Sequence, residues 1–360
     1  NDIFKRYNTQ PKELENIYES YVNNNKESIN DFKQSVLNNE EAINDFQEYI
    51  QEYIFINGIP VCICEFKSAI KEDTTIFDAW KQIHNRYKRD IPKLLKYCVI
   101  SMITDGANAK LGTIFTPYEF YYAWKKINEQ ERECDGISSL ITLLRGALST
   151  ERITKIIRDF IYYPDNSNKE KAIICRYPQF FAADKMFENI KAHLRPKGDG
   201  KGGTYFGATG CGKTYTMLFL ARQLKLRDND TFNNPTIIII VDRDDLDTQT
   251  SELFVESQNY LNDEDVRSIE TRKDLGDTLS INESGGVYIT TIQKFCESTG
   301  LLSSRNNIIC ISDEAHRTQT NKAAKQVKTE TGFEIKYGFA KYLRDSFPNA
   351  TYVGFSGTPI

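Results

Sequence analysis

A glycine-rich stretch in the second half of the chain has the residue types that bind a polyphosphate. Residues 207–214 read Gly-Ala-Thr-Gly-Cys-Gly-Lys-Thr, with the spacing G-x-x-x-x-G-K-[ST]. In such a loop the backbone N–H groups point inward at the phosphates, the lysine reaches the β- and γ-phosphates, and the threonine hydroxyl reaches Mg²⁺. The sequence therefore predicts that the polyphosphate of a nucleotide is bound by Gly207, Thr209, Gly210, Gly212, Lys213 and Thr214, with Thr214 also a ligand of Mg²⁺.

The segments on either side of this loop favour the same interpretation. Residues 203–206 read as a short strand, and residues 215–224 read as a helix. This order places the N-terminus of a helix, with its free N–H groups and positive dipole end, against the phosphates. An ordinary glycine-rich turn is the alternative interpretation.

Two adjacent carboxylates add hydrolysis to nucleotide binding. Asp313 and Glu314 follow the apolar run of residues 308–312, which reads as a buried strand. Ligands of parallel α/β sheets bind where the strands stop. We expect Asp313 to hold the Mg²⁺ shared with the β- and γ-phosphates and Glu314 to orient or deprotonate the attacking water. A solvated acidic pair at a strand end is the alternative.

A second candidate site lies in the N-terminal half. Glu65 and Lys67 end the apolar run that begins at Val61, and residues two apart on a strand project from the same face. A carboxylate can hold Mg²⁺ there, while a neighbouring lysine positions water and offsets phosphate charge. The pattern E-x-K is weak alone, because residues 334–336 fit it as well; its setting on a core strand after a hairpin favours the first copy.

The N-terminal elements indicate a mixed α/β domain. Residues 1–52 are polar and helix-prone, and Asn57-Gly58 between two β-rich runs predicts a hairpin. We expect strands at residues 53–56, 59–67, 97–103 and 110–115, and helices at 73–89, 117–128 and 137–148.

After about residue 169, strands and helices alternate, which favours a parallel sheet with helices on both faces. The candidate strands cover residues 203–206, 236–242, 286–291, 307–313 and 351–355. We therefore predict an α/β fold with two domains, residues 1–165 and residues 166–360.

Composition sets limits on the partners. The formal net charge of −4 gives no overall electrostatic attraction for nucleic acid, so any such contact must come from local patches. The eight cysteines are scattered and the three histidines lie far apart, which argues against a zinc site and for reduced thiols in the cytoplasm. Neither a signal peptide nor a membrane span is predicted.

The motor-like motifs resemble those of superfamily 2 helicases and translocases. In order, they are the phosphate loop, the Asp-Glu-Ala-His box at 313–316 and Ser-Gly-Thr at 356–358. The resemblance implies a RecA-like domain and assigns adenine recognition to Gln179, for which a buried glutamine satisfying backbone groups is the alternative. It also implies contacts with the nucleic acid backbone at residues 241–249 and at Thr290, Thr291 and Gln293. Capping of the helices that start after these strands is the alternative.

A closer resemblance covers most of residues 53–360. Residues 57–60, 64–67, 79–83, 87–92 and 103–106, together with the motor motifs, are similar to the restriction subunit of type I restriction-modification enzymes. It implies a PD-(D/E)xK-type endonuclease domain followed by a double-stranded DNA translocase driven by ATP and Mg²⁺, with specificity and methyltransferase subunits as partners. Catalytic roles then fall on Glu65, Lys67, Gln82, Tyr87 and Glu314, and Mg²⁺ binding on Glu65, Asp313 and Thr214.

Two positions depart from that family's pattern. Residues 51–52 are Gln-Glu where the family carries an aspartate after Arg-Pro, and Asp45 lies too far upstream of Glu65. In addition, one extra residue separates Gln82 from Tyr87.

Two further functions stay open from sequence. The first is a helicase or translocase whose N-terminal domain only binds or docks, and the second is a scaffold that binds ATP without hydrolysing it. Because the chain starts at Asn1 and stops at Ile360, we expect a fragment that lacks the second RecA-like domain.

Overall fold

The computed structural model describes residues 53–67, 75–105, 107–165, 171–208, 210–241, 244–295, 300–315, 325–329, 332–336 and 339–357. The chain divides into two compact units. The described residues up to Ile127, with Arg132–Gly146, form the first unit, and Asn128–Glu131 with the described residues from Ala147 onward form the second. The domain boundary expected at residues 165–166 stays a prediction.

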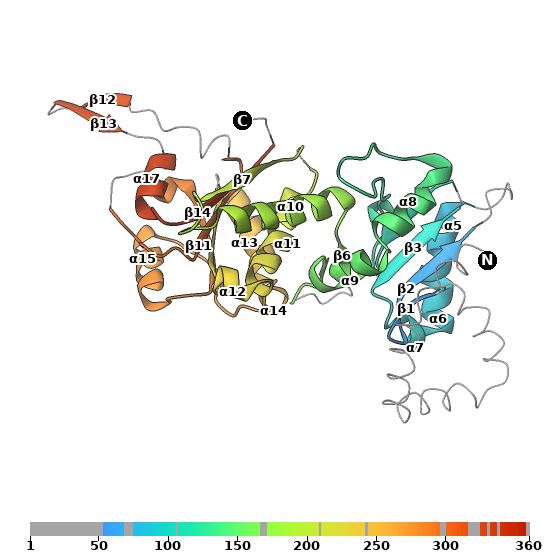
Figure 1. The fold of residues 1–360 in the computed structure, drawn as a ribbon. Coiled ribbons are helices and arrows are strands. Elements are labelled where there is room, and N and C mark those ends of the chain that lie inside the picture. The colour runs from blue at the N-terminus through green and yellow to red at the C-terminus, as the bar shows by residue number, and fades with distance from the viewer. Residues whose placement is uncertain are drawn as a thin grey trace. The chain divides into compact units, whose positions relative to one another are not determined.

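The first unit is built on a four-stranded mixed sheet, as the sequence predicts (Figure 1). Its strands, in sheet order, are β1 (Tyr53–Ile56), β2 (Ile59–Phe66), β3 (Ile100–Thr104) and β4 (Ala109–Gly112). Strands β1 and β2 are antiparallel, β2 and β3 are parallel, and β3 and β4 are antiparallel.

The hairpin that joins β1 to β2 turns at the predicted Asn-Gly pair. Asn57 and Gly58 both have positive φ, 51° and 77°. Two successive positive φ angles match the right-handed twist of the flanking strands, and asparagine and glycine adopt them at the lowest cost.

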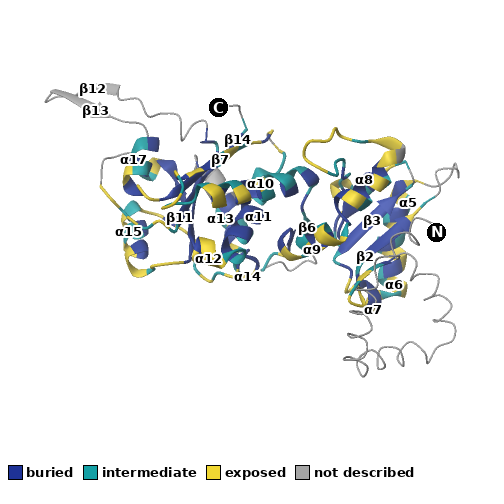
Figure 2. Ribbon diagram, viewed as in Figure 1, coloured by how far each residue is buried: buried dark blue, intermediate teal, exposed yellow. Residues whose placement is uncertain are grey.

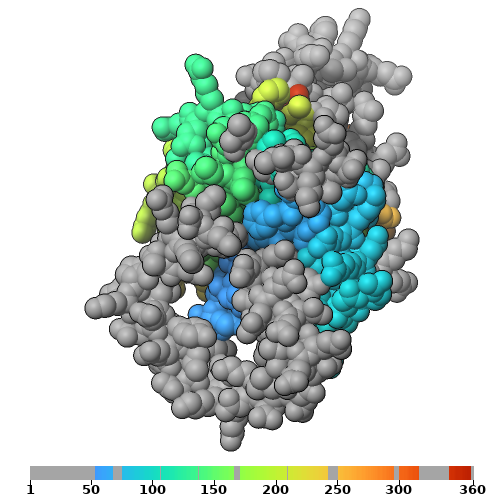
Figure 3. All heavy atoms as spheres, turned by 90° about the vertical axis from the view of Figure 1, so that its right-hand side faces the viewer, coloured from blue at the N-terminus to red at the C-terminus, as the bar shows by residue number. Residues whose placement is uncertain are grey.

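One helical segment crosses the sheet between the parallel strands β2 and β3. It comprises α5 (Ile76–Lys81), η1 (Gln82–Tyr87) and α6 (Lys88–Asp90), and α7 (Pro92–Leu95) follows it. Ile76, Ala79, Ile83 and Tyr87 are buried along one side of this segment. They form a hydrophobic core with residues of the sheet, including Ile63 and Ile103. In the space-filling view, the helical segment, in light blue to cyan, lies beside the blue residues of the first two strands (Figure 3).

The prediction of a helix at residues 117–128 is wrong. Only the short 3₁₀ helix η2 (Tyr118–Phe120) forms there, followed by extended chain. The backbone of Tyr122 pairs with Leu111 in both directions, at 2.9 and 3.0 Å, which extends the sheet edge. The Tyr121 hydroxyl donates to Ser101 at 2.7 Å. These tertiary bonds outweigh the local helix preference.

The expected helix at residues 137–148 corresponds to η3 (Gly136–Ser138) and α8 (Ser139–Gly146). Residue 106, in the turn expected between β3 and β4, lies outside the described residues.

The second unit contains a six-stranded sheet in which all strands are parallel, which confirms the RecA-like architecture. The strand order is β7 (Lys201–Phe206), β14 (Thr351–Ser356), β11 (Ile308–Ser312), β8 (Thr236–Val241), β10 (Val287–Thr291) and β9 (Val266–Ser268). The sequence predicts the first five of these strands and misses the three-residue edge strand β9.

Helices cover this sheet, and its four central strands, β14, β11, β8 and β10, are buried (Figure 2). Side chains of α15 (Arg272–Ile281) and α17 (Phe339–Ser346) form one core cluster with alternate residues of the strands, such as Ile238 and Ile240. Successive residues of a strand point to opposite faces of the sheet, so Ile237 and Ile239 face the other side. There, α10 (Tyr177–His193) packs against β7 and α11 (Lys213–Leu226).

The remaining elements of the second unit are α9 (Thr150–Asp159), β5 (Ile161–Tyr162), β6 (Ile173–Ile174), α12 (Asn229–Phe232), α13 (Asp244–Val255), α14 (Gln258–Leu261), η4 (Ile292–Phe295), β12 (Lys325–Thr329) and β13 (Gly332–Lys336). The carboxylate of Asp159, at the end of α9, is fully buried. It accepts bonds from Arg227, directly after α11, at 2.5 and 2.8 Å. This charge pair ties the end of α9 to the end of α11.

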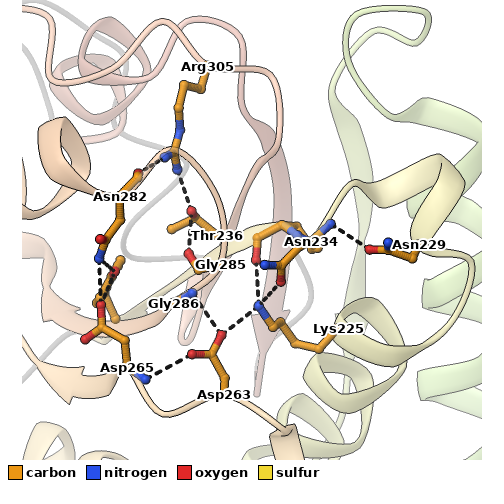
Figure 4. Close-up of polar contacts among 12 residues, drawn as sticks. Lys225, Asn229, Asn234, Thr236, Asp263, Asp265, Asn282, Gly285, Gly286 and Arg305 are labelled. Atoms are coloured by element: carbon orange, nitrogen blue, oxygen red, sulfur yellow. Dashed lines mark hydrogen bonds and ion pairs between the residues drawn. The ribbon is translucent and has the colours of Figure 1, made fainter.

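A polar network holds the edge of the sheet at which β8 and β10 begin (Figure 4). The ammonium group of Lys225 in α11, whose side chain is 3% exposed, lies 2.7 Å from Asp263 and donates to Asn234 at 2.6 Å. Asp263 also accepts the Gly286 N–H at 2.8 Å. An open cavity of about 330 Å³ lies beside these groups. It is at the amino edge of the sheet, whereas ligands of parallel sheets bind at the carboxyl edge.

Among the described helices, none combines the length and the apolar character needed to cross a bilayer. The seven cysteines that the structure describes are free thiols.

The half-buried side chain of His84 predicts a pH-dependent stability for the first unit. Burial lowers the pKa of His84 from 6.5 to about 4, because the charged form loses solvation. Between pH 6.5 and 4, His84 is therefore protonated in the unfolded chain but neutral in the folded chain. The free energy of unfolding consequently falls as the pH drops through that window. The ring is partly exposed, so we expect a loss of about 1–2 kcal/mol.

Tryptophan fluorescence measures this loss, because Trp80 and Trp124, the two tryptophans of the chain, both lie in the first unit. Urea unfolding at pH 7.5 and pH 5 is compared for wild type, His84→Phe and the control His193→Gln, whose side chain is 44% exposed. His84→Phe reduces the pH dependence and His193→Gln leaves it unchanged. An equal pH dependence in all three proteins contradicts the assignment.

Candidate active sites

The phosphate loop occupies the turn between β7 and α11. Gly212 precedes the first residue of α11 with φ 84°, and Gly210 has φ 80°, so both positions favour glycine. The Gly207 N–H donates to the Ser356 carbonyl at the end of β14, at 3.0 Å. Lys213 and Thr214 begin α11, while Thr209 lies outside the described residues.

Gln179 supports this loop from the first turn of α10. Its side chain is buried; Oε1 accepts the Arg176 N–H at 2.8 Å, and Nε2 donates to the Gly212 carbonyl at 3.1 Å. A Cβ atom on Gly212 would lie 2.4 Å from Gln179 Nε2. The amide thus satisfies backbone groups and fills the space next to Gly212, and its expected contact with adenine stays a prediction.

The acidic pair follows β11 directly. Asp313 is 8% exposed, and its Oδ1 accepts the Glu314 N–H at 2.9 Å. Glu314 has φ 46°, a left-handed conformation that costs a non-glycine residue about 1–2 kcal/mol. Such backbone strain is retained where the surroundings hold it, often at functional sites.

The loop and the acidic pair meet at one edge of the sheet. Lys213 Nζ lies 3.6 Å from Glu314 Oε1, and the Gly357 N–H makes a long contact of 3.5 Å to Glu314 Oε2. The strands that carry these residues, β7, β14 and β11, are neighbours in the parallel sheet, so their carboxyl ends coincide. The contact between Gly357 and Glu314 was not expected from the sequence, which gives no sign that the two turns touch.

This edge fits a magnesium nucleotide by its chemistry. The loop backbone and Lys213 offer donors to a polyphosphate, at the N-terminus of α11. Asp313 and Thr214 offer the hard oxygen ligands that Mg²⁺ prefers.

The second candidate site surrounds Glu65, the penultimate residue of β2. Its side chain is 2% exposed, and both carboxylate oxygens are held. Lys67 Nζ lies 2.6 Å from Oε1, and the Tyr87 hydroxyl donates to Oε2 at 2.6 Å. A buried carboxylate needs such partners, because an unpaired charge in the interior is costly.

Gln82 closes these contacts into a ring of four side chains. Lys67 Nζ donates to Gln82 Oε1 at 2.5 Å, and Gln82 Nε2 donates to the Tyr87 hydroxyl at 2.8 Å. The structure therefore brings together all four residues that the sequence selects around Glu65. Lys67 retains a 17% exposed side chain, so the ring reaches the surface on the side of its ammonium group.

A π-helix accommodates the extra residue between Gln82 and Tyr87. The element η1 covers these two residues and the four between them, within a segment that is otherwise α-helical. A π-turn bonds residues five apart and so absorbs one inserted residue, and it is frequent at functional sites. Gln82 and Tyr87 can then both face Glu65 despite the longer spacing.

Glu65 is one carboxylate, and a metal ion needs further ligands. Among the described residues, no group of three His, Cys, Asp or Glu side chains could hold a metal ion. Residues 51–52, at the position of the family's aspartate, and Asp45, farther upstream, lie outside the described residues. The Glu65 ring therefore fits Mg²⁺ only in part.

The residues expected to touch a nucleic acid are partly described. Thr290 and Thr291 end β10 and are buried, and Gln293 lies in the short helix η4. Residues 242–243 and 316 lie outside the described range.

Family comparisons match both halves of the chain. Residues 178–360 match the SWI2/SNF2 ATPase family, and residues 5–120 match the type I restriction enzyme R protein N terminus.

Similar proteins come from bacteria and archaea. The chain is 33% identical over 314 residues to the type I restriction enzyme HindI endonuclease subunit of Haemophilus influenzae. It is 32% identical over 335 residues to the putative type I restriction enzyme MjaIXP endonuclease subunit of Methanocaldococcus jannaschii. Each alignment covers 85% of this chain and 29% of the relative, so the chain spans under a third of these relatives' length.

The packing of Gln179 on Gly212 predicts unequal effects of two alanine substitutions. Gly210→Ala meets no atom within 4 Å, so it should cost only the strain of a positive φ, about 1–2 kcal/mol. Gly212→Ala adds displacement of the Gln179 amide and loss of its hydrogen bonds, about 1 kcal/mol more.

Chemical unfolding measures the difference. Gly210→Ala and Gly212→Ala are each compared in the wild-type protein and in the Gln179→Ala protein. In the Gln179→Ala background the two glycine substitutions should cost nearly the same. If Gly212→Ala remains costlier by the full difference there, Gln179 is not the cause.

Proposed function

The chain belongs to the SWI2/SNF2 ATPase family and is homologous to type I restriction enzyme endonuclease subunits, and we propose that it is the nuclease and first motor part of such a subunit. In this proposal ATP hydrolysis by the second unit drives translocation on double-stranded DNA, and the first unit cleaves the DNA. The observation that carries the proposal is the presence, in one chain, of the Lys213–Glu314 site and of the Glu65 ring.

In the motor site, each residue has a separate task. The phosphate loop and Lys213 bind the β- and γ-phosphates, while Asp313 and Thr214 hold Mg²⁺, which offsets phosphate charge when bound. Glu314 orients or deprotonates the attacking water. Lys213 lies close to Glu314 without nucleotide, so the arriving phosphates compete with the carboxylate for the same ammonium group. Gly357, in contact with Glu314, links the hydrolysis site to the end of β14.

In the nuclease site, Glu65 contributes a Mg²⁺ ligand and Lys67 positions water and offsets the charge of the scissile phosphate. Gln82 and Tyr87 fix the orientation of these two groups through the hydrogen bonds that connect the four side chains. The remaining metal ligands come from the DNA, from water or from residues outside the described part of the chain.

The proposed partners follow from the relatives' role as type I restriction enzyme subunits. They are double-stranded DNA, a specificity subunit and a methyltransferase subunit, in the cytoplasm of a prokaryotic cell. A second RecA-like domain, which the family uses to complete the ATP site, belongs to the full-length subunit.

Lys213→Ala tests the motor site. We expect it to abolish ATP hydrolysis and translocation by the full-length complex, because the ammonium group that contacts the β- and γ-phosphates is lost. Phosphate release and triplex displacement measure the two activities. Lys201→Ala, at the exposed start of β7, is the control and should retain both. ATP turnover at the wild-type rate in Lys213→Ala would exclude this site.

Glu65→Gln tests the nuclease site while keeping the shape of the side chain. Cleavage of plasmid DNA by the full-length complex with Mg²⁺ or Mn²⁺ should fall by at least about 100-fold. ATPase activity should stay within twofold, because the two sites lie in separate units. Glu334→Gln, in the second E-x-K stretch, is the matched control and should cleave normally.

The same assay decides between the proposal and a translocase whose first unit only binds or docks. The absence of a three-ligand acidic group among the described residues favours that alternative. It holds if the wild-type complex neither nicks nor cuts plasmid DNA while it hydrolyses ATP. Release of phosphate likewise excludes a scaffold that only binds ATP.

A further inference from the structure

A ridge of aromatic rings lies on the helical segment that carries Gln82. The rings of Phe77 and Trp80 are stacked, with centroids 5.6 Å apart and an interplanar angle of 5°. Trp80 in turn stacks on His84, at 4.4 Å and 22°. Tyr118 packs its edge against Phe77 at 4.8 Å. Spacings of three and four residues place Phe77, Trp80 and His84 on one side of the segment.

This ridge has an accessible end and carries positive charge. Phe77 is 38% exposed, unlike Ile76, Ala79 and Ile83, which form the core side of the segment. Lys81 Nζ lies 4.5 Å from the centroid of Phe77, and Lys110 Nζ lies 4.8 Å from that of Tyr118. Lys81 also contacts Asp78 at 3.3 Å, with both side chains exposed, so this ion pair opens at little cost.

The ridge reaches the sheet face of the Glu65 ring through Lys110, whose ammonium group contacts Tyr118. In the sheet, Glu65 pairs with Ile103, which pairs with Lys110, so Lys110 and Glu65 share a face two strands apart, about 9–10 Å. This separation equals roughly three base steps of 3.4 Å along a strand.

We propose that Phe77, Trp80, His84, Tyr118, Lys81 and Lys110 form a platform that binds an unpaired nucleobase and adjoining phosphates of the DNA strand at the Glu65 site. This rests on the proposed nuclease function. A base laid on the Phe77 end extends the existing stack, and the ammonium groups contact phosphates. Bases inside a duplex are stacked already, so the platform takes bases at strand ends or at frayed positions.

Photocrosslinking in the full-length complex tests the platform separately from cleavage. The probe is a single-stranded oligonucleotide containing 5-iododeoxyuridine, used with the Glu65→Gln protein so that the DNA stays intact. We expect crosslinks to platform residues, identified by mass spectrometry. Phe77→Ala should lower their yield roughly tenfold and Phe77→Tyr should restore it. Since the readout is binding, its failure is distinct from a failure of the nuclease assay.

Matched variants keep the test decisive. Phe120→Ala removes another exposed phenylalanine of the same unit, 59% exposed and outside the stack, and should not change the yield. If Phe77→Ala fails to fold, as tryptophan fluorescence would reveal, Lys81→Glu and Lys81→Arg decide: the first should lose crosslinks and the second keep them. Unchanged crosslinking in Phe77→Ala or Lys81→Glu overturns the proposal. Loss of assembly with the partner subunits at unchanged crosslinking also overturns it, and assigns the ridge to a protein contact.

Discussion

The contact between Lys213 and Glu314 depends on a constraint that parallel strands impose. Neighbouring parallel strands end at the same edge, so residues a hundred positions apart in sequence become adjacent when β7, β14 and β11 lie side by side. Without that strand order, the phosphate loop, the acidic pair and the turn after β14 would be three unrelated loops. The 3.6 Å separation of Lys213 and Glu314 is therefore a consequence of sheet topology.

Both sites pair a carboxylate with a lysine, but the two carboxylates differ in how far they are buried. Glu65 is 2% exposed and has both oxygens occupied, whereas Glu314 is 26% exposed and its contacts are longer. The tight ring around Glu65 fixes geometry, since each member satisfies the next. The looser contacts of Glu314 leave room for a ligand to separate it from Lys213.

Local patterns predict much of this structure. The Asn57-Gly58 turn, five of the six parallel strands and the pair Glu65 and Lys67 follow from turn chemistry, apolar runs and spacing. Gln82 and Tyr87 follow only from the family resemblance. The errors arise where tertiary contacts override local preference. The backbone of Tyr122 joins a sheet edge instead of a helix, and β9 is too short to leave a periodic signal. The one-residue insertion before Tyr87 is visible in sequence, but its solution as a π-helix depends on Gln82 and Tyr87 both reaching Glu65.

Ion pairs with little exposure hold the C-terminal end of helix α11. Lys225, in its last turn, lies 2.7 Å from Asp263, and Arg227, the first residue after the helix, lies 2.5 Å from the buried Asp159. At the other end of the helix, Lys213 makes the longer contact of 3.6 Å with Glu314. This helix of 14 residues, about 21 Å long, is therefore fixed at the end far from the phosphate loop. We expect the far end of this helix to stay in place when a ligand enters between Lys213 and Glu314, so that the movement is confined to the turns at the carboxyl edge of the sheet.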